Sequence, residues 1–258
     1  MTPFTAVLRS EWTKLMSLRS TKVALALSVV LALALTALLA VVAGATYDDW
    51  TAADRQSWEP GEASLIGGIL AAIVLAVLGV TAATGEYVSG TIRLTFTATP
   101  RRGRVLAAKT LVVAAISLAA ALVSNVTMFL LGQALFGAYG LGTASLLDGD
   151  SLRTVFLGGA LGPLLPVVAL LIGLAVRSAA AAITAVFAFV VGVPILGELL
   201  PRWWQDHVFD YMLFAAADAI TNTDASSGLA PAAAVLVVAG WMAVLLALTW
   251  ALLERRDA

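Results

Sequence analysis

The sequence has no cysteine and a single histidine, His207. The lack of cysteine excludes a disulfide framework and a cysteine nucleophile, and one histidine without thiols leaves no Cys/His metal site. Charged residues are also scarce, at 12% of the chain, against about 25% in a typical soluble domain. A chain with so little polar surface, of which 61% is hydrophobic, belongs in a bilayer.

Six apolar runs are each long enough to cross a bilayer as an α-helix. The first, TKVALALSVVLALALTALLAVVAGA, is too long and too far along the chain for a signal peptide. The sequence therefore predicts an all-α integral membrane protein with one transmembrane domain over residues 1–258. The predicted spans are about 23–45, 64–84, 108–136, 154–176, 179–200 and 231–252.

Lysine and arginine predict the orientation of these spans. With the N-terminus inside, twelve of the 15 basic residues lie on the cytoplasmic side, and twelve of the 16 acids lie on the other side. Both termini are then cytoplasmic, and residues 85–105 form a cytoplasmic loop between the second and third spans. We expect a multi-pass protein of the cell's inner (plasma) membrane.

The stretch before the first span has a helical pattern of apolar residues. These are Phe4, Val7, Leu8, Trp12, Leu15 and Met16. The pattern predicts an interfacial helix on the inner membrane surface, although Glu11 near its apolar face weakens it. The alternative is a plain cytosolic extension that its positive charges keep inside.

Residues 199–230 are too long for a tight turn and mix aromatic residues with acids. They predict short helices or a partly re-entrant hairpin at the outer interface. The alternative is an ordinary aromatic belt at the end of the fifth span.

Several functional signatures are absent from the sequence. No G-x-x-x-x-G-K-[ST] occurs, so the chain has no P-loop of its own. Ser89 and His207 fall on opposite sides of the membrane and cannot form a catalytic pair. No carboxylate lies well inside a span, since Glu86 and Glu198 sit at span ends, so ion coupling has no obvious group. We predict no catalytic residue and no metal site, and an energy source in another chain.

The loop GEYVSGTIRLTFTATPRRGRV, residues 85–105, is the most informative stretch. It resembles the cytoplasmic loop of ABC-2 type permeases, the membrane subunits of a class of ABC transporters, which carry E-x-x-x-G-T-[LI] followed by a proline and basic residues. The matching residues are Glu86, Gly90, Thr91, Ile92, Pro100, Arg101, Arg102 and Arg104. LRSEWTKLMSLRST before the first span and LERRDA at the end look like actinobacterial-type members, so the resemblance covers essentially the whole chain. Tyr87 and Val88 depart from it, since many members carry more charge there.

The resemblance implies an exporter in which two permease subunits, identical or not, each contact a separate ABC ATPase that binds ATP and Mg. The loop would form a short coupling helix docked on that ATPase, with Glu86 accepting hydrogen bonds from it, Gly90 making a turn and Thr91 capping the next segment. Its residues are Glu86, Tyr87, Gly90, Thr91, Ile92 and Arg93. The cargo would be an amphipathic small molecule, a peptide or a lipid-like molecule. We expect this chain to bind no cofactor, and to contact lipid but no nucleic acid.

Other features have more ordinary interpretations. The basic cluster Arg101, Arg102, Arg104 and Lys109 is better explained as an anchor to anionic headgroups than as a partner contact. Asn125, Gly158 and Gly162 suit helix packing or, less directly, a transport pathway. Two rival functions remain: a membrane scaffold or sensor subunit, which would bind no ATPase, and an intramembrane enzyme, for which converging catalytic groups are lacking.

Overall fold

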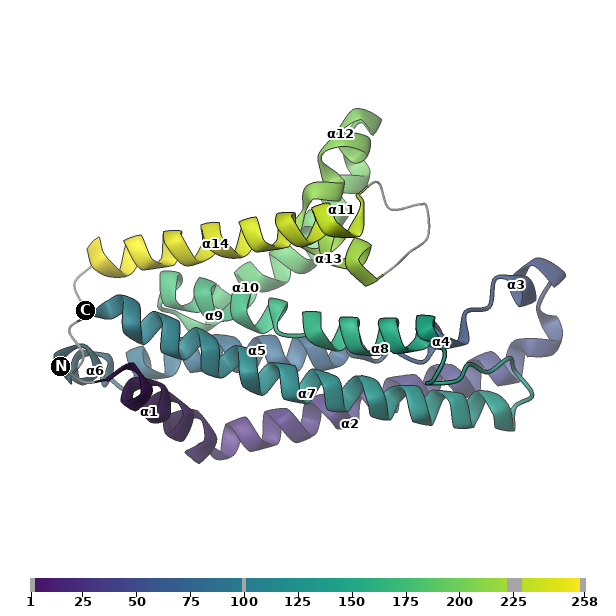
Figure 1. Ribbon diagram of the computed structural model, residues 1–258, viewed down its shortest axis with the longest axis horizontal. Coiled ribbons are helices and arrows are strands. Elements are labelled where there is room, and N and C mark those ends of the chain that lie inside the picture. The colour runs from purple at the N-terminus through teal and green to yellow at the C-terminus, as the bar shows by residue number, and fades with distance from the viewer. Residues whose placement is uncertain (1–2, 99–100, 222–228, 256–258) are drawn as a thin grey trace. The chain divides into compact units, whose positions relative to one another are not determined.

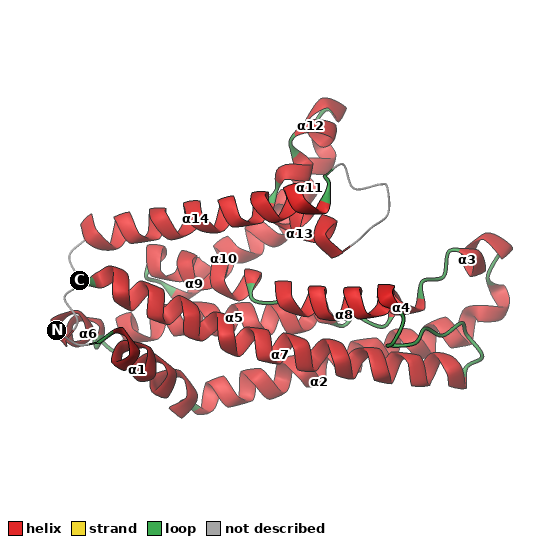
Figure 2. Ribbon diagram, viewed as in Figure 1, coloured by secondary structure: helices red, strands yellow, loops and turns green. Residues whose placement is uncertain are grey.

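The structure is a computed structural model that describes residues 3–98, 101–221 and 229–255. These residues form helices joined by turns and loops, and they contain no strand (Figure 2). The prediction of an all-α protein is confirmed. Pro100 and Arg256, which belong to the loop motif and the basic C-terminus, lie outside the described residues.

The described residues contain six helical segments that are long and apolar enough to cross a membrane, so the predicted number of spans is confirmed (Figure 1). The chain is therefore a multi-pass membrane protein. The spans are α2 (Arg19–Thr46), α5 (Gly68–Val88), α7 (Arg102–Ala138), α8 (Gly149–Leu161) followed by α9 (Leu164–Val176), the segment that begins with α10 (Ala179–Phe187), and α14 (Pro231–Arg255).

Two span boundaries differ from the prediction by several residues. Helix α5 begins at Gly68 and extends to Val88, so Glu86 lies in the last turn of a membrane helix. Helix α7 begins at Arg102, well before the apolar run itself, and has 37 residues. At 1.5 Å per residue it is about 55 Å long, which exceeds the roughly 30 Å hydrocarbon core.

Shorter helices precede the spans, connect them or, in the fifth span, continue them. One of them, α1 (Phe4–Ser17), occupies the N-terminal stretch, and α6 (Ile92–Ala98) lies between the second and third spans. The others are η1 (Tyr47–Asp49), α3 (Ala52–Gln56), α4 (Pro60–Ala63), η2 (Ala188–Gly192), α11 (Val193–Leu199), α12 (Arg202–His207), η3 (Phe209–Tyr211) and α13 (Leu213–Thr221). The expectation of short helices after residue 199 is met by the last three.

The chain divides into two compact units, each of which is described by itself. The first unit contains residues up to Thr21, Ala76–Ala115 and the part from Leu164 onward. The second unit contains Lys22–Leu75 and Ile116–Pro163. Helices α2, α5 and α7 each contribute residues to both units.

The core of the first unit is built around α9, whose residues Val168, Leu170 and Leu171 are almost fully buried. Helices α10 and α14 both contact α9, and α13 contacts α14. Glycine allows α5 to approach α9 closely: a Cβ on Gly79 would lie 2.1 Å from the carbonyl oxygen of Pro166. The two backbones are thus in contact, as is common for small residues in membrane helices.

The second unit is also held by close helix contacts and by aromatic packing. Met128 of α7 packs with Ala32 of α2 and Ala71 of α5. Nearer the far ends of the same helices, Phe136 packs against Ala40 and Trp58, and the rings of Trp58 and Phe136 are 5.1 Å apart. This edge-to-face arrangement suits the quadrupoles of the two rings.

The fourth and fifth spans are interrupted at prolines. Helix α8 ends at Leu161 and α9 begins at Leu164, so the break includes Pro163. In the fifth span, the π-helical turn η2 comes directly before α11, which has Pro194 in its first turn. Proline lacks the backbone N–H that would continue α-helical pairing, and a wide turn before it accommodates this loss.

Candidate functional site

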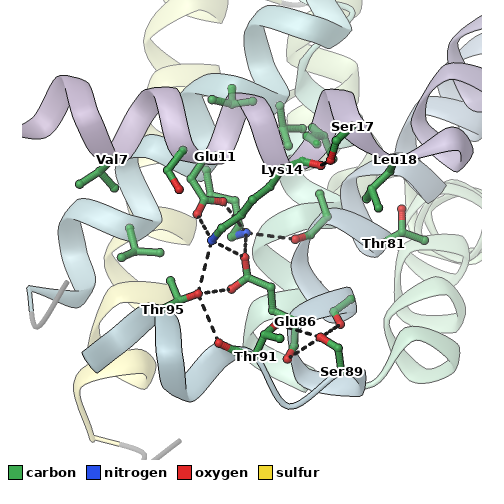
Figure 3. Close-up of a pocket in the computed structure, with 18 of the residues that line it drawn as sticks. Val7, Glu11, Lys14, Ser17, Leu18, Thr81, Glu86, Ser89, Thr91 and Thr95 are labelled. Carbon is green, nitrogen blue, oxygen red and sulfur yellow. Dashed lines mark hydrogen bonds and ion pairs between the residues drawn. The ribbon is translucent and has the colours of Figure 1, made fainter. Parts of the chain in front are cut away.

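Four charged side chains form a closed ring within the first unit, which we call the ionic ring: Glu11, Lys14, Glu86 and Lys109 (Figure 3). The Nζ atom of Lys14 is 2.7 Å from Glu11 Oε1 and 2.9 Å from Glu86 Oε1. The Nζ atom of Lys109 is 2.7 Å from Glu11 Oε2 and 3.1 Å from Glu86 Oε1. Acids and bases alternate around the ring, so its net charge is zero.

Both lysines use their full donor capacity within the chain. Lys14 donates to Glu11, to Glu86 and, at 3.3 Å, to the hydroxyl of Thr95. Lys109 pairs with the same two carboxylates and also donates to the carbonyl oxygen of Ala82 at 3.3 Å. Complete pairing matters here because Glu11 is only 4% exposed and Lys109 only 7%, and a buried charge is costly unless it is paired.

Helix α1 directs Glu11 inward because of its position among apolar residues. Val7, Glu11 and Leu15 are the buried residues of α1 and occur at intervals of four, which places them on one helical face. The acid that weakened the predicted apolar face is therefore on the buried side, where Lys109 neutralises it. In the sequence, this buried ion pair is indicated by one carboxylate, that of Glu11, among the apolar residues of one helical face.

Helix α6 joins the ring through Thr95. The Thr95 hydroxyl donates to Glu86 Oε2 at 3.2 Å and accepts from Lys14, so α6 is linked to both α5 and α1. The turn that leads into α6 contains Gly90 at φ +69°, a left-handed conformation that glycine adopts without strain. Thr91 follows it, and its hydroxyl is hydrogen-bonded to that of Ser89 at 2.8 Å.

Glu86 and Lys109, for which the sequence predicts contacts outside the chain, also have partners within it. Glu86 was expected to accept hydrogen bonds from a partner protein, but both of its oxygens are engaged by Lys14, Lys109 and Thr95. Lys109 was grouped with the headgroup-anchoring arginines, but its side chain is buried between Glu11 and Glu86. Each of these two groups is one of two counter-charges that the other meets in the ionic ring, and such pairing is stronger where water is partly excluded.

The remaining residues of the predicted coupling loop lie around this ring. Ile92 is buried, at 5% exposure, and starts α6, whereas Arg93 lies one residue further along the helix. Tyr87 is half-buried, and the guanidinium carbon of Arg177 lies 5.3 Å from its ring centroid, a cation–π contact.

The predicted basic anchor is not a uniform surface. Arg101 is exposed, Arg104 is half-buried, and Arg102 donates from Nη1 to the carbonyl oxygen of Leu253 near the end of α14. A cation at the C-terminal end of a helix is favourable because unpaired carbonyls carry partial negative charge there. Arg102 therefore ties α7 to α14 in addition to any interaction with lipid.

Asn125, Gly158 and Gly162 lie together at the contact between α7 and α8 in the second unit. Asn125 Nδ2 donates to the carbonyl oxygen of Val155 at 3.2 Å, and a Cβ on Gly158 would lie 3.3 Å from the same nitrogen. A Cβ on Gly162 would lie 2.2 Å from that of Ala121. These contacts support the helix-packing interpretation of the three residues over a transport pathway.

Three residues of the site were not singled out from the sequence for these contacts: Glu11, Lys14 and Thr95. Lys14 and Thr95 carry no local signal, since an exposed lysine and a threonine are ordinary on short helices. In the described part of the chain, no group of three or more His, Cys, Asp or Glu side chains is arranged to hold a metal ion. The chemistry that this site supports is charge pairing between helices.

The pKa of Lys14 gives a prediction for alkaline pH. Burial lowers this pKa, but hydrogen bonds and charge attraction from Glu11 and Glu86 outweigh burial and raise it above 10.5. The contribution of Lys14 to holding α1 is therefore fully present below pH 10.5 and is lost as the pH rises through the raised pKa. We expect a spin label at Thr13→Cys, on the exposed side of α1, to become more mobile only above that pH.

The cysteine-free sequence makes such a label unique. The matched control carries Lys14→Met as well, and its label should lack the alkaline step because the titrating group is gone. A step of equal size in both proteins would show that Lys14 does not hold α1.

Comparison with known proteins identifies the family of the chain. A family described as "Protein of unknown function (DUF2705)" matches residues 56–258. The chain belongs to this family. The DUF2705 match includes Glu86, Thr95 and Lys109 of the site, whereas Glu11 and Lys14 precede it. No curated protein matches the chain.

Proposed function

We propose that this chain is the membrane permease subunit of an ATP-driven ABC exporter, and that a separate ATPase supplies the energy. The resemblance of residues 85–105 to the loop of ABC-2 type permeases supports this function, as do the six membrane-spanning segments. The cargo class that suits a path lined by alanine, leucine and valine is an amphipathic small molecule, a peptide or a lipid-like molecule. A second permease subunit and the inner (plasma) membrane are parts of the same proposal.

The observation that carries the proposal is the environment of α6. This short helix lies between two membrane spans, with Ile92 buried at 5% exposure and Thr95 bonded to the ionic ring. Leu94, between them in sequence, is 71% exposed. A docking element for another protein needs an exposed apolar side chain on a helix whose other side chains hold it in place. Leu94 is such a side chain, because Ile92 and Thr95 hold α6 against the rest of the unit.

The ionic ring gives α6 a mechanical connection to the spans. Thr95 contacts Glu86 of α5 and Lys14 of α1, and Glu86 in turn contacts Lys109 of α7. A displacement of α6 would therefore move three other helices with it, rather than being absorbed by a flexible loop. This fits a subunit whose ATPase partner drives the permease between inward- and outward-facing states.

Docking can be tested at Leu94 without disturbing the ring. We expect Leu94→Glu to reduce at least tenfold the amount of P-loop ATPase that co-purifies with the tagged protein in mild detergent, measured by quantitative mass spectrometry. The reason is that a carboxylate at the centre of an apolar contact would be desolvated without a partner. Glu86→Arg is a poorer test, because it would also break the ionic ring.

Leu147→Glu is the matched control, since Leu147 is 86% exposed in the loop between α7 and α8. The control should retain the ATPase. Equal loss in both variants would assign the effect to surface charge, and the absence of any ATPase from the native protein would favour the membrane scaffold or sensor subunit.

A further inference from the structure

A cavity of about 810 Å³ lies beside the ionic ring, and all of its lining residues belong to the first unit (Figure 3). Helices α1, α5, α6 and α7 each contribute to its wall. Its volume falls in the range of about 300–1,000 Å³ that is usual for small-molecule sites. The ionic ring holds α1 to the spans by charge pairing at one place. The cavity lies beside this place, where α1 and the spans do not pack closely against each other.

Most of the cavity wall is apolar. The contributing side chains include Val7, Leu15, Leu18, Leu94, Val105 and Val112. Val105 and Val112 are nearly fully buried, at 4% and 3% exposure, so the inner wall is fixed by the packing of α7. Such a wall binds hydrocarbon through burial of apolar surface.

The charges in the wall are neutralised by one another. Each lysine of the ionic ring faces two carboxylates, and each carboxylate faces two lysines. A ligand with a net charge would bring an unpaired ion into this partly buried space without finding a free counter-charge, which is costly. The cavity therefore favours an uncharged ligand.

Three of the hydroxyls that line the cavity are placed to act as acceptors. Ser17 donates its proton to the carbonyl oxygen of Lys14 at 2.8 Å, Thr81 to that of Leu78 at 3.0 Å, and Ser89 to that of Gly85 at 2.9 Å. A hydroxyl has one donor and two acceptor lone pairs. Since the donors of these three hydroxyls are used within the chain, the capacity that they offer a ligand is acceptor capacity.

We propose that this cavity binds an uncharged amphiphile, an apolar chain whose head group carries hydroxyl or amide N–H donors, with α1 as its outer wall. Long-chain alcohols and monoacylglycerols have this chemistry. The proposal goes beyond the transport function and does not depend on it, because the site lies within one chain and needs no ATPase. Its test can therefore fail or succeed independently of the docking experiment at Leu94.

The test uses the full-length protein in nanodiscs of phosphatidylcholine, whose head group has no hydrogen-bond donor. A photoactivatable monooleoylglycerol is the probe, and a photoactivatable oleate of the same chain length is its charged counterpart. We expect saturable cross-links from the neutral probe to cavity residues of α1, α5 and α7, located by mass spectrometry. Cross-linking by oleate at these positions should be at least tenfold lower.

Two variants separate the polar and apolar contributions. Thr81→Val removes one acceptor at an exposed position and should weaken neutral-probe binding about two- to tenfold, the usual range for one hydrogen bond. Its control is Thr127→Val, because Thr127 makes the same kind of bond to a backbone carbonyl but does not line the cavity. Val112→Trp puts a much larger side chain into the cavity wall and should lower the cross-links to the residues around it.

The proposal is overturned by any of three results. These are equal cross-linking by oleate, no saturable cross-link at the cavity residues, and binding that Thr81→Val leaves unchanged relative to Thr127→Val. Because Thr81 is exposed, its variant keeps the test decisive even if Val112→Trp prevents folding.

Discussion

Replacing Lys109 by methionine is expected to lower the free energy of unfolding by about 3–5 kcal/mol, the usual cost of removing one partner from a buried ion pair. Methionine has a similar length and packs well in apolar surroundings, so the loss comes from the charge. Without Lys109, Glu11 and Glu86 share only Lys14, which is 41% exposed. One negative charge is then buried without compensation. Unfolding by SDS in mixed micelles would measure the change.

The same experiment has two internal controls. Lys22→Met removes an exposed lysine from the first turn of α2 and should change stability by less than about 0.5 kcal/mol. Adding Glu86→Gln to Lys109→Met restores charge balance, and the double variant should recover part of the loss because the two residues are coupled. Strictly additive effects of the two substitutions would contradict the ionic ring.

Gly79→Val is expected to be the second severe change, with a loss of about 3 kcal/mol. A Cβ at this position would lie 2.1 Å from the carbonyl oxygen of Pro166 and 3.2 Å from the amide nitrogen of Leu170. These atoms belong to the backbone of α9 and cannot rotate away, so α5 and α9 must separate. Thermal unfolding in detergent would report the loss as a lower midpoint.

Gly85→Val, six residues further along α5, is the matched control. A Cβ on Gly85 would meet nothing within 4 Å, and valine has a better helix propensity than glycine. We expect no loss of stability from it. If Gly79→Val proved as harmless as Gly85→Val, the close approach of α5 to α9 would be wrong.

The comparison of sequence and structure shows which features are encoded locally. The spans could be predicted because hydropathy over about 20 residues depends only on the residues themselves. The start of α7 could not be predicted in this way, because the helix begins at Arg102, before the apolar run that hydropathy detects. A proline such as Pro163 is a local signal for a helix break, whereas the π-helical form of the turn before Pro194 has no such local signal.

The ionic ring illustrates the limit of the sequence more sharply. Lys14 and Glu86 are 72 residues apart, and nothing local indicates that they meet. The sequence did identify Glu86 as unusual, but assigned its counter-charge to another protein. Only Glu11, an acid on an apolar helical face, pointed to a buried partner within the chain, because such a group is tolerated only when it is paired.

The π-helical turn Ala188–Gly192 also sets the rotational phase of the fifth span. In an uninterrupted α-helix, at about 100° per residue, Ile195 would lie about 80° around the axis from Phe187. A π turn contains one extra residue, which offsets about 100° of this rotation. Phe187 and Ile195 therefore lie within about 20° of each other around the helix axis. The exposed side chains Ile183, Phe187, Ile195 and Leu199 thereby form a single apolar stripe along the whole span. Deleting one residue from this turn would rotate the second half of the stripe away from the first.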